Sequence, residues 1–382
     1  MNEECFFYNA VAITLLGDRR AINKARQDSQ NWAETYAMVA ERIRNEGVGL
    51  PLYGKGAPPS RIPDPERSAS ELEKAGIRIL LATDPLFPRS LREIPHPPNA
   101  IYIKGNFPMR TGGADGSART IAIVGTRQAT QEGKVIARRF GAALSSAGFA
   151  IASGLAFGID GAGHEGCLAT HGGSAIAVLA GGLATVHPRN HEYLARKILA
   201  ADGVLVSEYP FHEPPFARRF IERNRLVSGL SRGILVIEAP EGSGALSTAR
   251  FAFEQNRDVF VLPGNVSQKN YRGSNRLIRQ GAELVASPED IFETYGMVIK
   301  NPHGTSDGYT GHTAVRGALT PEENLVLEAI ACMESGGAAA ADVDKISAMA
   351  KLEPRIVNQT LAFLIIKNIV KENADGFAMN NE

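Results

Sequence analysis

Short apolar runs alternate with helix-compatible segments through the middle of the chain. The segment after the first run has Val135, Ile136, Phe140 and Leu144 at helical spacing. Strands that are apolar along their whole length and alternate with helices predict a parallel sheet with helices on both faces. We therefore expect an α/β fold, with an extended Rossmann-like domain over residues 119–295. Its predicted strands are residues 120–125, 149–153, 174–180, 203–208, 233–239 and 258–264.

The regions on either side of this domain have different patterns. Residues 1–75 predict a helical domain, and residues 76–118 predict a connecting segment with two short strands that ends in a Gly-rich loop. Residues 296–318 have the composition of a linker. Residues 319–382 predict three helices and a terminal hairpin, which is the pattern of a winged helix.

Composition narrows the class of protein. Hydrophobic residues make up 44% of the chain and charged residues 21%, the balance of a soluble globular protein. The three cysteines are far apart in the sequence, which excludes a disulfide framework and a CxxC site and favours a reducing, cytoplasmic location. No apolar run reaches about 18 residues, so we expect no transmembrane helix and no membrane partner.

The charges are balanced overall but not along the chain. The sequence contains 41 basic and 41 acidic side chains. Residues 76–317 contain 26 basic and 20 acidic side chains, whereas residues 318–382 contain 5 and 10. The basic centre favours a polyanionic ligand. The acidic C-terminal region is poorly suited to holding DNA, because phosphate contacts dominate that affinity.

The turns after the first two predicted strands combine glycine with polar side chains. Gly125-Thr126-Arg127 ends the first strand and lacks the G-x-G-x-x-G fingerprint of a dinucleotide site. An arginine there could hold a phosphate with two N–H groups, and an exposed loop arginine is an equally good interpretation. Ser153-Gly154 could direct a hydroxyl and backbone N–H groups at an anion.

Two pairs of side chains have spacings that catalysis or metal binding could use. Asp160 and His164 are one helical turn apart, and a structural hydrogen bond is favoured over a catalytic dyad. His187 and His191 are spaced like metal ligands, but Pro188 lies between them and no third ligand is near. We therefore predict no catalytic residue, no metal and no cofactor. Arg189 and Asn190, in the same turn as the second pair, are better placed to meet a polar ligand.

Arginine is densest just after the fourth predicted strand. Only one acid, Glu222, opposes these arginines, whereas a solvated helix face usually mixes both charges. The arginines are Arg218, Arg219, Arg223 and Arg225, with Asn224 between the last two. Two Gly-rich turns follow. One contains Ser243 and Gly244, and the other contains Lys269, Arg272 and Arg276. Together these segments predict a continuous groove for a polyanion.

The order of these motifs resembles one known family. The motifs are GTR (125–127), SGLAFGID (153–160), HPRN (187–190), SEYP (207–210), RNRLVSGLS (223–231), EGSGALSTA (241–249), PGN (263–265) and GSNRLIRQGAELV (273–285). The chain is similar to the DNA-processing protein A family, also called Smf, over essentially all of residues 119–295. The N-terminal region resembles the SAM-like domain of some members, and the tail resembles their winged-helix-like domain.

The resemblance implies a fold and a function. Members have an extended Rossmann fold that binds single-stranded DNA in a basic pocket, form a homodimer and load the RecA recombinase onto incoming DNA in natural transformation. No catalytic activity is implied. Arg127 matches the arginine of the family's GSR motif, although Thr126 replaces its serine. Arg223, Asn224 and Arg225 match its RNR motif, although Ile221 replaces the proline that usually precedes it.

These arguments define a set of predicted DNA-binding residues. The set is Gly125, Thr126, Arg127, Ser153, Gly154, Arg189, Asn190, Arg218, Arg219, Arg223, Asn224, Arg225, Ser243 and Gly244. The alternative is a nucleotide-binding hydrolase of the phosphoribohydrolase type, which has a similar fold and a PGG-x-GT-x-x-E motif. The nearest segments here lack the glutamate at that spacing. The missing fingerprint also disfavours an NAD-dependent enzyme.

Overall fold

The computed structural model describes residues 2–46, 62–107, 119–297, 321–335, 341–366, 369–373 and 376–379. The chain forms two compact units, Met1–Lys300 and Asn301–Glu382. The Gly-rich loop predicted at 111–118 and most of the linker predicted at 296–318 lie outside the described residues.

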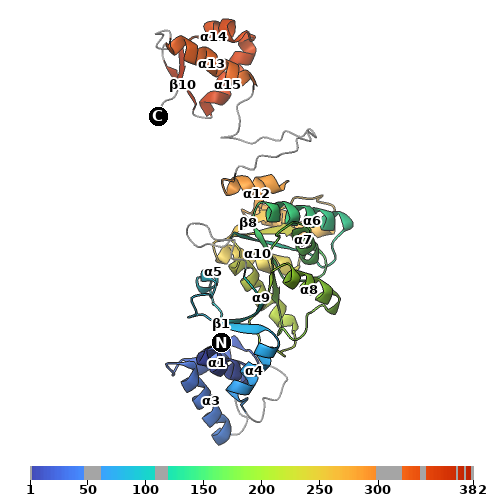
Figure 1. Ribbon diagram of the computed structural model, residues 1–382. Helices are drawn as coiled ribbons and strands as arrows, with labels where there is room; N and C mark the ends of the chain where they lie inside the picture. Colours follow the sequence, from blue (N-terminus) through green and yellow to red (C-terminus); the bar gives the residue numbers. More distant parts are fainter. Residues whose placement is uncertain are drawn as a thin grey trace. The chain divides into compact units, whose positions relative to one another are not determined.

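A nine-stranded sheet forms the centre of the first unit (Figure 1). The strands are β1 (Ile77–Leu81), β2 (Ala100–Gly105), β3 (Thr120–Gly125), β4 (Ala150–Ser153), β5 (Ala175–Leu179), β6 (Val204–Ser207), β7 (Gly233–Ile237), β8 (Asp258–Val261) and β9 (Glu283–Leu284). Their order is β1-β2-β6-β5-β4-β3-β7-β8-β9. Neighbours from β6 to β9 pair in parallel, whereas β2 pairs antiparallel with both β1 and β6. The predicted parallel sheet is confirmed, and the two strands of the connecting segment extend it.

Helices cover both faces of the sheet because the strands are apolar on both sides. Along β3, Ile121 and Ile123 belong to one hydrophobic core, and Ala122 and Val124 belong to the other. Helices α6, α7, α8 and α12 contribute to the first core, and α5, α9, α10 and α11 contribute to the second. The bounds are α5 (Arg89–Arg92), α6 (Gln131–Ser146), α7 (Ile159–Leu168), α8 (Glu192–Ala200), α9 (Ala217–Gly229), α10 (Gly244–Glu254), α11 (Arg272–Arg279) and α12 (Pro288–Thr294).

The N-terminal helices pack against the antiparallel edge of the same sheet. They are α1 (Glu3–Thr14), α2 (Arg19–Arg26), α3 (Trp32–Glu46) and α4 (Pro65–Lys74). Tyr8 of α1 meets Trp32 edge-on, with 4.9 Å between ring centroids. The hydroxyl of Tyr102 on β2 donates to Asn9 Oδ1 at 3.0 Å. The helical region therefore shares its core with the sheet, and its SAM-like character stays a prediction.

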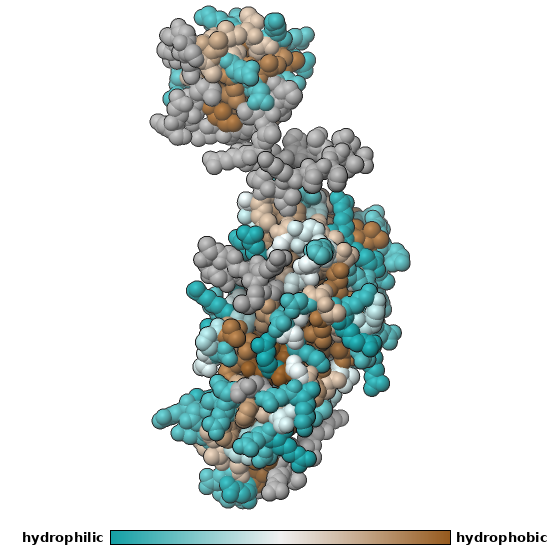
Figure 2. Space-filling model, viewed as in Figure 1, coloured by the Kyte–Doolittle hydropathy of each residue, from teal (hydrophilic) through white to brown (hydrophobic). Residues whose placement is uncertain are grey.

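The described residues of the second unit form three helices and one hairpin. The elements are α13 (Pro321–Ser335), α14 (Val343–Ala350), α15 (Pro354–Ile366), β10 (Val370–Asn373) and β11 (Gly376–Met379). Its core contains Val326, Ile330, Ile346, Val357 and Leu361. Three helices and a hairpin match the predicted order of elements, and the winged-helix assignment stays a prediction. Both units expose some large hydrophobic side chains (Figure 2). Among the described residues, no helix has the length and apolarity that a membrane span requires.

Candidate functional site

A cavity of about 690 Å³ lies at the carboxyl ends of β3, β4 and β7. After β3 the chain adds β4, β5 and β6 on one side of that strand and then places β7 on its other side. Open α/β sheets bind their ligands at such a switch in strand order, outside the carboxyl ends of the strands. The cavity therefore occupies the position where this class of fold binds a ligand.

Many of the predicted residues line this cavity, and several unpredicted ones join them. The predicted residues in the lining are Gly125, Thr126, Arg127, Gly154, Arg223, Asn224, Ser243 and Gly244. The other lining residues are Val124, Gln128, Ala156, Asp160, Ala217, Phe220, Ile221, Val227, Pro240, Glu241, Gly242, Ala245, Thr248 and Lys269. Of these, only Lys269 was named in the groove predicted from the sequence. The helical period was a usable signal for part of this set, because Ala217, Phe220, Asn224 and Val227 recur on one face of α9.

Arg127 is an exposed cation at the edge of the cavity. Its guanidinium carbon lies 4.9 Å from the centroid of the Phe220 ring, within the range of a cation–π contact. The Phe220 ring also contacts the His187 ring edge-on, with 5.7 Å between the ring centroids. Arg127 belongs to none of the ion pairs found among the described residues. Its N–H groups are therefore available to an anionic ligand.

Lys269 is a second exposed cation of the lining. It begins the short 3-10 helix η3 (Lys269–Tyr271), which follows β8. It too is absent from the ion pairs of the described residues. Glu241 is an exposed acid on the same rim. The rim thus has two available cations and one exposed acid.

Arg223 lines the cavity but acts as a brace. Its exposed fraction is 3%. It donates from Nη1 to the carbonyl oxygens of Gly154, at 2.8 Å, and Val178, and from Nε to Asn224 Oδ1 at 3.2 Å. Burial lowers the pKa of Arg223 to about 10. The guanidinium ties α9 to the ends of β4 and β5, so most of its hydrogen-bonding capacity is used inside the protein.

Ser153 and Gly154 do not present the anion-binding groups that the sequence suggested. Ser153 is fully buried and donates from Oγ to the carbonyl oxygen of Ile123 at 2.6 Å. The Gly154 N–H donates to Asp160 Oδ2 at 3.1 Å. A Cβ atom at Gly154 would lie 2.4 Å from Arg223 Nη2. Glycine is needed here to accommodate the buried arginine.

Arg225 also differs from the expectation of an anion-binding arginine. Its Nη2 donates to Glu208 Oε1 at 2.6 Å and Oε2 at 2.7 Å. Both side chains are buried, with exposed fractions of 7% and 8%. Arg225 is therefore half of an internal ion pair, on the side of α9 that does not line the cavity.

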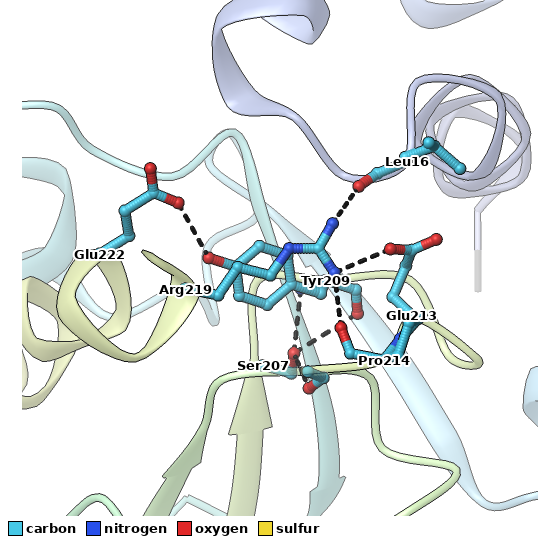
Figure 3. A network of polar contacts seen from close by, with 8 residues as sticks. Leu16, Ser207, Tyr209, Glu213, Pro214, Arg219 and Glu222 are labelled. Atoms are coloured by element: carbon cyan, nitrogen blue, oxygen red, sulfur yellow. Dashed lines mark hydrogen bonds and ion pairs between the residues drawn. The ribbon is translucent and has the colours of Figure 1, made fainter. Parts of the chain in front are cut away.

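Arg218 and Arg219 point away from the cavity, whose lining at this end of α9 is Ala217. Arg218 pairs with Glu222 at 2.6 Å on the exposed side of the helix. Arg219 donates to Glu213 Oε2 at 2.7 Å and to two backbone carbonyls, those of Pro214 and Leu16 (Figure 3). The four arginines therefore do not form one continuous groove, because each turn of α9 directs them to different partners.

The HPRN turn lies outside the main cavity. Arg189 and Asn190 are exposed residues of the 3-10 helix η2 (Arg189–His191). Asn190 and His191 line a second cavity of about 520 Å³ beside α7 and α8. His191 Nδ1 contacts the carbonyl oxygen of Leu155 at 2.9 Å. The turn thus supports the loop after β4 without adding a side chain to the lining of the main cavity.

Asp160 and His164 do not form the predicted hydrogen bond. Asp160 Oδ2 accepts from the N–H groups of Gly154 and Ala156. His164 is fully buried, and neither of its ring nitrogens has a partner among the described residues. Burial lowers the pKa of His164 to about 3, so the imidazole is neutral at physiological pH. No acid–base pair is formed by these two side chains.

Comparison with known proteins identifies the family. The model of the family described as DNA recombination-mediator protein A matches residues 78–296. The chain belongs to this family. Protein Smf of Escherichia coli K12 is 42% identical over 228 residues, which are 60% of this chain and 59% of that protein. The chain thus spans about three fifths of that relative. A putative DNA processing protein DprA of Mycobacterium tuberculosis H37Rv is 33% identical over 348 residues, 87% of this chain and 85% of that protein.

Solved structures of DNA processing protein A share the fold. The X-ray structure of the Streptococcus pneumoniae protein has a TM-score of 0.58 and 27% identity, and covers 75% of this chain and 95% of that one. The Helicobacter pylori protein has a TM-score of 0.50 and 27% identity, and covers 57% of this chain and 95% of that one. Its structure was described for a single-stranded DNA binding mode. The α/β fold with a large, mostly parallel sheet is thereby confirmed, and the hydrolase alternative is not favoured.

Proposed function

We propose that this protein binds single-stranded DNA in the cavity at the switch in strand order and acts as a non-enzymatic recombination mediator. The observation that carries the proposal is Arg127, an exposed guanidinium without a carboxylate partner among the described residues, held over the Phe220 ring at the edge of that cavity. Family membership supports the biological role, and the single-stranded ligand of the Helicobacter pylori relative supports the choice of ligand.

Phosphate groups are the part of DNA that the two available cations recognise. Arg127 holds a phosphate oxygen pair with its planar fork, and Lys269 adds a point charge on the other segment of the rim. Neither contact reads the identity of a base, so binding is largely independent of sequence. Asn224, with its amide N–H group 3.2 Å from the carbonyl oxygen of Gly244, keeps α9 and the start of α10 together at the floor.

Bases account for the preference for single strands. Phe220 and the half-exposed Ile221 give the cavity an apolar wall that a base can contact. Stacking of a base on an aromatic ring contributes about 1–3 kcal/mol and tolerates any base. Duplex DNA keeps its bases paired inside the helix and cannot place one against this wall.

Family membership supports proposals for the remaining parts of the role. We infer that the protein is a cytoplasmic homodimer, that it protects incoming DNA and that it loads RecA recombinase in natural transformation. The Asp160 and His164 side chains are poorly suited to act as the acid and base of a hydrolase. Asp160 has its carboxylate oxygen engaged by two backbone N–H groups, and the neutral His164 imidazole is buried.

The test compares Arg127→Ala with Arg218→Ala by fluorescence anisotropy on a labelled oligothymidine. Loss of one charge-assisted phosphate contact costs about 1–3 kcal/mol, which is roughly a 5- to 150-fold weaker affinity. Arg218→Ala removes the same side chain from the far side of α9 and should change affinity less than about twofold. Equal affinity for a matched duplex, or a folded Arg127→Ala variant that binds like the wild type, contradicts the proposal.

A further inference from the structure

Glu238 is a fully buried carboxylate directly after β7 that no part of the proposed function has used. Its backbone φ of 49° lies in the left-handed region, which residues other than glycine rarely adopt. Strained backbone of this kind persists where the surrounding contacts over-determine it, often beside a functional site. The contacts of the carboxylate show what fixes it.

Four donors surround the Glu238 carboxylate. Thr130 donates twice, from its N–H to Oε2 at 2.9 Å and from its hydroxyl to Oε1. Asn270 Nδ2 donates to Oε2 at 3.1 Å, and the Tyr271 hydroxyl lies 3.5 Å from Oε1. Burial and then the adjacent Glu238 raise the pKa of Tyr271 to about 12, so this phenol keeps its proton. All four contacts therefore direct a hydrogen toward the carboxylate.

The carboxylate lies at the N-terminus of α6. Thr130 is the N-cap of that helix, and its side chain accepts from the Gly133 N–H. A Cβ atom at Gly133 would lie 2.6 Å from Glu238 Oε1, so the carboxylate fills the space beside the first turn. In dinucleotide-binding folds, the N-terminus of the first helix receives the ligand's pyrophosphate. Here an anion of the protein itself occupies that position.

The same carboxylate joins the two segments that carry the available cations. On one side, Thr126 N–H donates to the Glu238 carbonyl oxygen at 2.7 Å and Thr130 holds the carboxylate, with Arg127 between them in the sequence. On the other side, Asn270 is adjacent to Lys269 and bridges the carboxylate to the Gln128 carbonyl oxygen at 3.2 Å. Both edges of the cavity are thus attached to one residue, the Arg127 segment through its carbonyl oxygen and carboxylate and the Lys269 segment through its carboxylate.

We propose that Glu238 is a positioning residue for the DNA cavity: its carboxylate is a built-in anion at the N-terminus of α6 that fixes the Arg127 turn and the Lys269 segment. The inference rests on the proposed function. It also explains why the first turn needs no dinucleotide fingerprint, because the helix N-terminus already has its anion and a ligand phosphate must bind farther out, at Arg127.

The experiment measures single-stranded DNA affinity in Glu238→Ala, Glu238→Gln and a control, Glu293→Ala, at an exposed acid of α12 outside the cavity lining. Glu238→Ala removes the carboxylate contacts of both segments while the main-chain bond to Thr126 remains, and we expect affinity to fall about tenfold, the loss of one charge-assisted contact. Glu238→Gln keeps the shape and one acceptor oxygen but removes the negative charge and the second acceptor, so affinity should fall by less than in Glu238→Ala. Glu293→Ala removes an acid of the same charge away from the cavity and should leave affinity unchanged.

Two readouts separate positioning from general destabilisation. In the Glu238→Ala background, Arg127→Ala should weaken binding by much less than it does in the wild type, because Arg127 is already misplaced. Sodium acetate, whose anion has the size of the deleted group, should restore affinity of Glu238→Ala more than sodium chloride at equal ionic strength. If Glu238→Ala does not fold, Asn270→Ala removes one bridge only and should show the same reduced effect of Arg127→Ala.

The possible failures are distinguishable. Arg127→Ala effects of the same size with and without Glu238 or Asn270 overturn this inference and leave the proposed function intact. Equal rescue by acetate and chloride argues against the built-in anion in the same way. An Arg127→Ala variant that binds single strands like the wild type overturns the proposed function, and this inference with it.

Discussion

Arg219 should stabilise the fold without contributing to DNA binding. Its exposed fraction is 11% and that of its partner Glu213 is 14%, so their ion pair is largely removed from water. The guanidinium also lies 4.4 Å from the centroid of the Tyr209 ring and 4.9 Å from that of Phe216. Its bond to the Leu16 carbonyl joins α9 to the turn after α1 (Figure 3). Substitution by alanine removes all of these contacts together.

The magnitude follows from the burial of the pair. Breaking a buried ion pair by removing one partner costs about 3–5 kcal/mol, and residual exposure places this pair near the lower bound. The two ring contacts add roughly 0.5–1 kcal/mol each. We expect Arg219→Ala to lower the free energy of unfolding by about 4–5 kcal/mol, which does not exceed the about 5–15 kcal/mol that folded proteins typically have. The variant should therefore fold, with a Tm lower by roughly 10 °C.

The assay pairs thermal unfolding with DNA binding at a temperature where the variant is folded. Arg219→Lys should lie between wild type and alanine, since an ammonium cannot reproduce the planar fork. Arg218→Ala is the control, because its exposed pair with Glu222 contributes at most about 0.5 kcal/mol. Single-stranded DNA affinity of folded Arg219→Ala should stay within about twofold of the wild type. A variant as stable as Arg218→Ala that has lost DNA affinity would refute the reasoning and restore Arg219 to the DNA site.

Three further predictions follow from the same contacts. Gly154→Ala should lower stability by about 1–3 kcal/mol, measured by urea unfolding, because the new Cβ meets the buried Arg223 guanidinium. Burial lowers the pKa of His164 to about 3, so between about pH 6.5 and pH 3 the unfolded chain binds a proton that the folded chain does not. The free energy of unfolding should therefore decrease as the pH falls through that range, by up to about 1.4 kcal/mol per pH unit. Urea unfolding of His164→Leu should show a shallower decrease, and an equal slope contradicts this. Residues 318–382 contain 5 basic and 10 acidic side chains, so deletion of residues 319–382 should leave most single-stranded DNA affinity intact. A folded truncation that no longer binds in the anisotropy assay would contradict this argument from charge.

The sequence determined the central architecture because hydrophobic pattern and turn chemistry are local properties. Runs such as 120–125 and 233–239 are apolar on both sides, which only a strand covered on two faces tolerates. The glycine-containing turns after these strands were recognised for the same reason. Since the carboxyl ends of parallel strands share one edge of the sheet, the turns that carry Arg127 and Ser243 were expected at the same edge, and both residues line the cavity.

Only the tertiary structure decided which of the arginines face the cavity. A run of arginines on one helix predicts a single basic patch. In the structure, Glu208 pairs with Arg225 and Glu213 pairs with Arg219. Arg219 also donates to the carbonyl oxygen of Leu16, which is far away in the sequence. The identity of such partners depends on how α9 packs, which local propensity does not encode. The contacts of Glu238 could not be predicted from the sequence for the same reason, because its carboxylate finds its partners only when β3, β7 and the segment after β8 pack together. The role of a polar side chain thus depends on the partners that tertiary packing brings to it, whereas the strands can be predicted from the order of apolar residues.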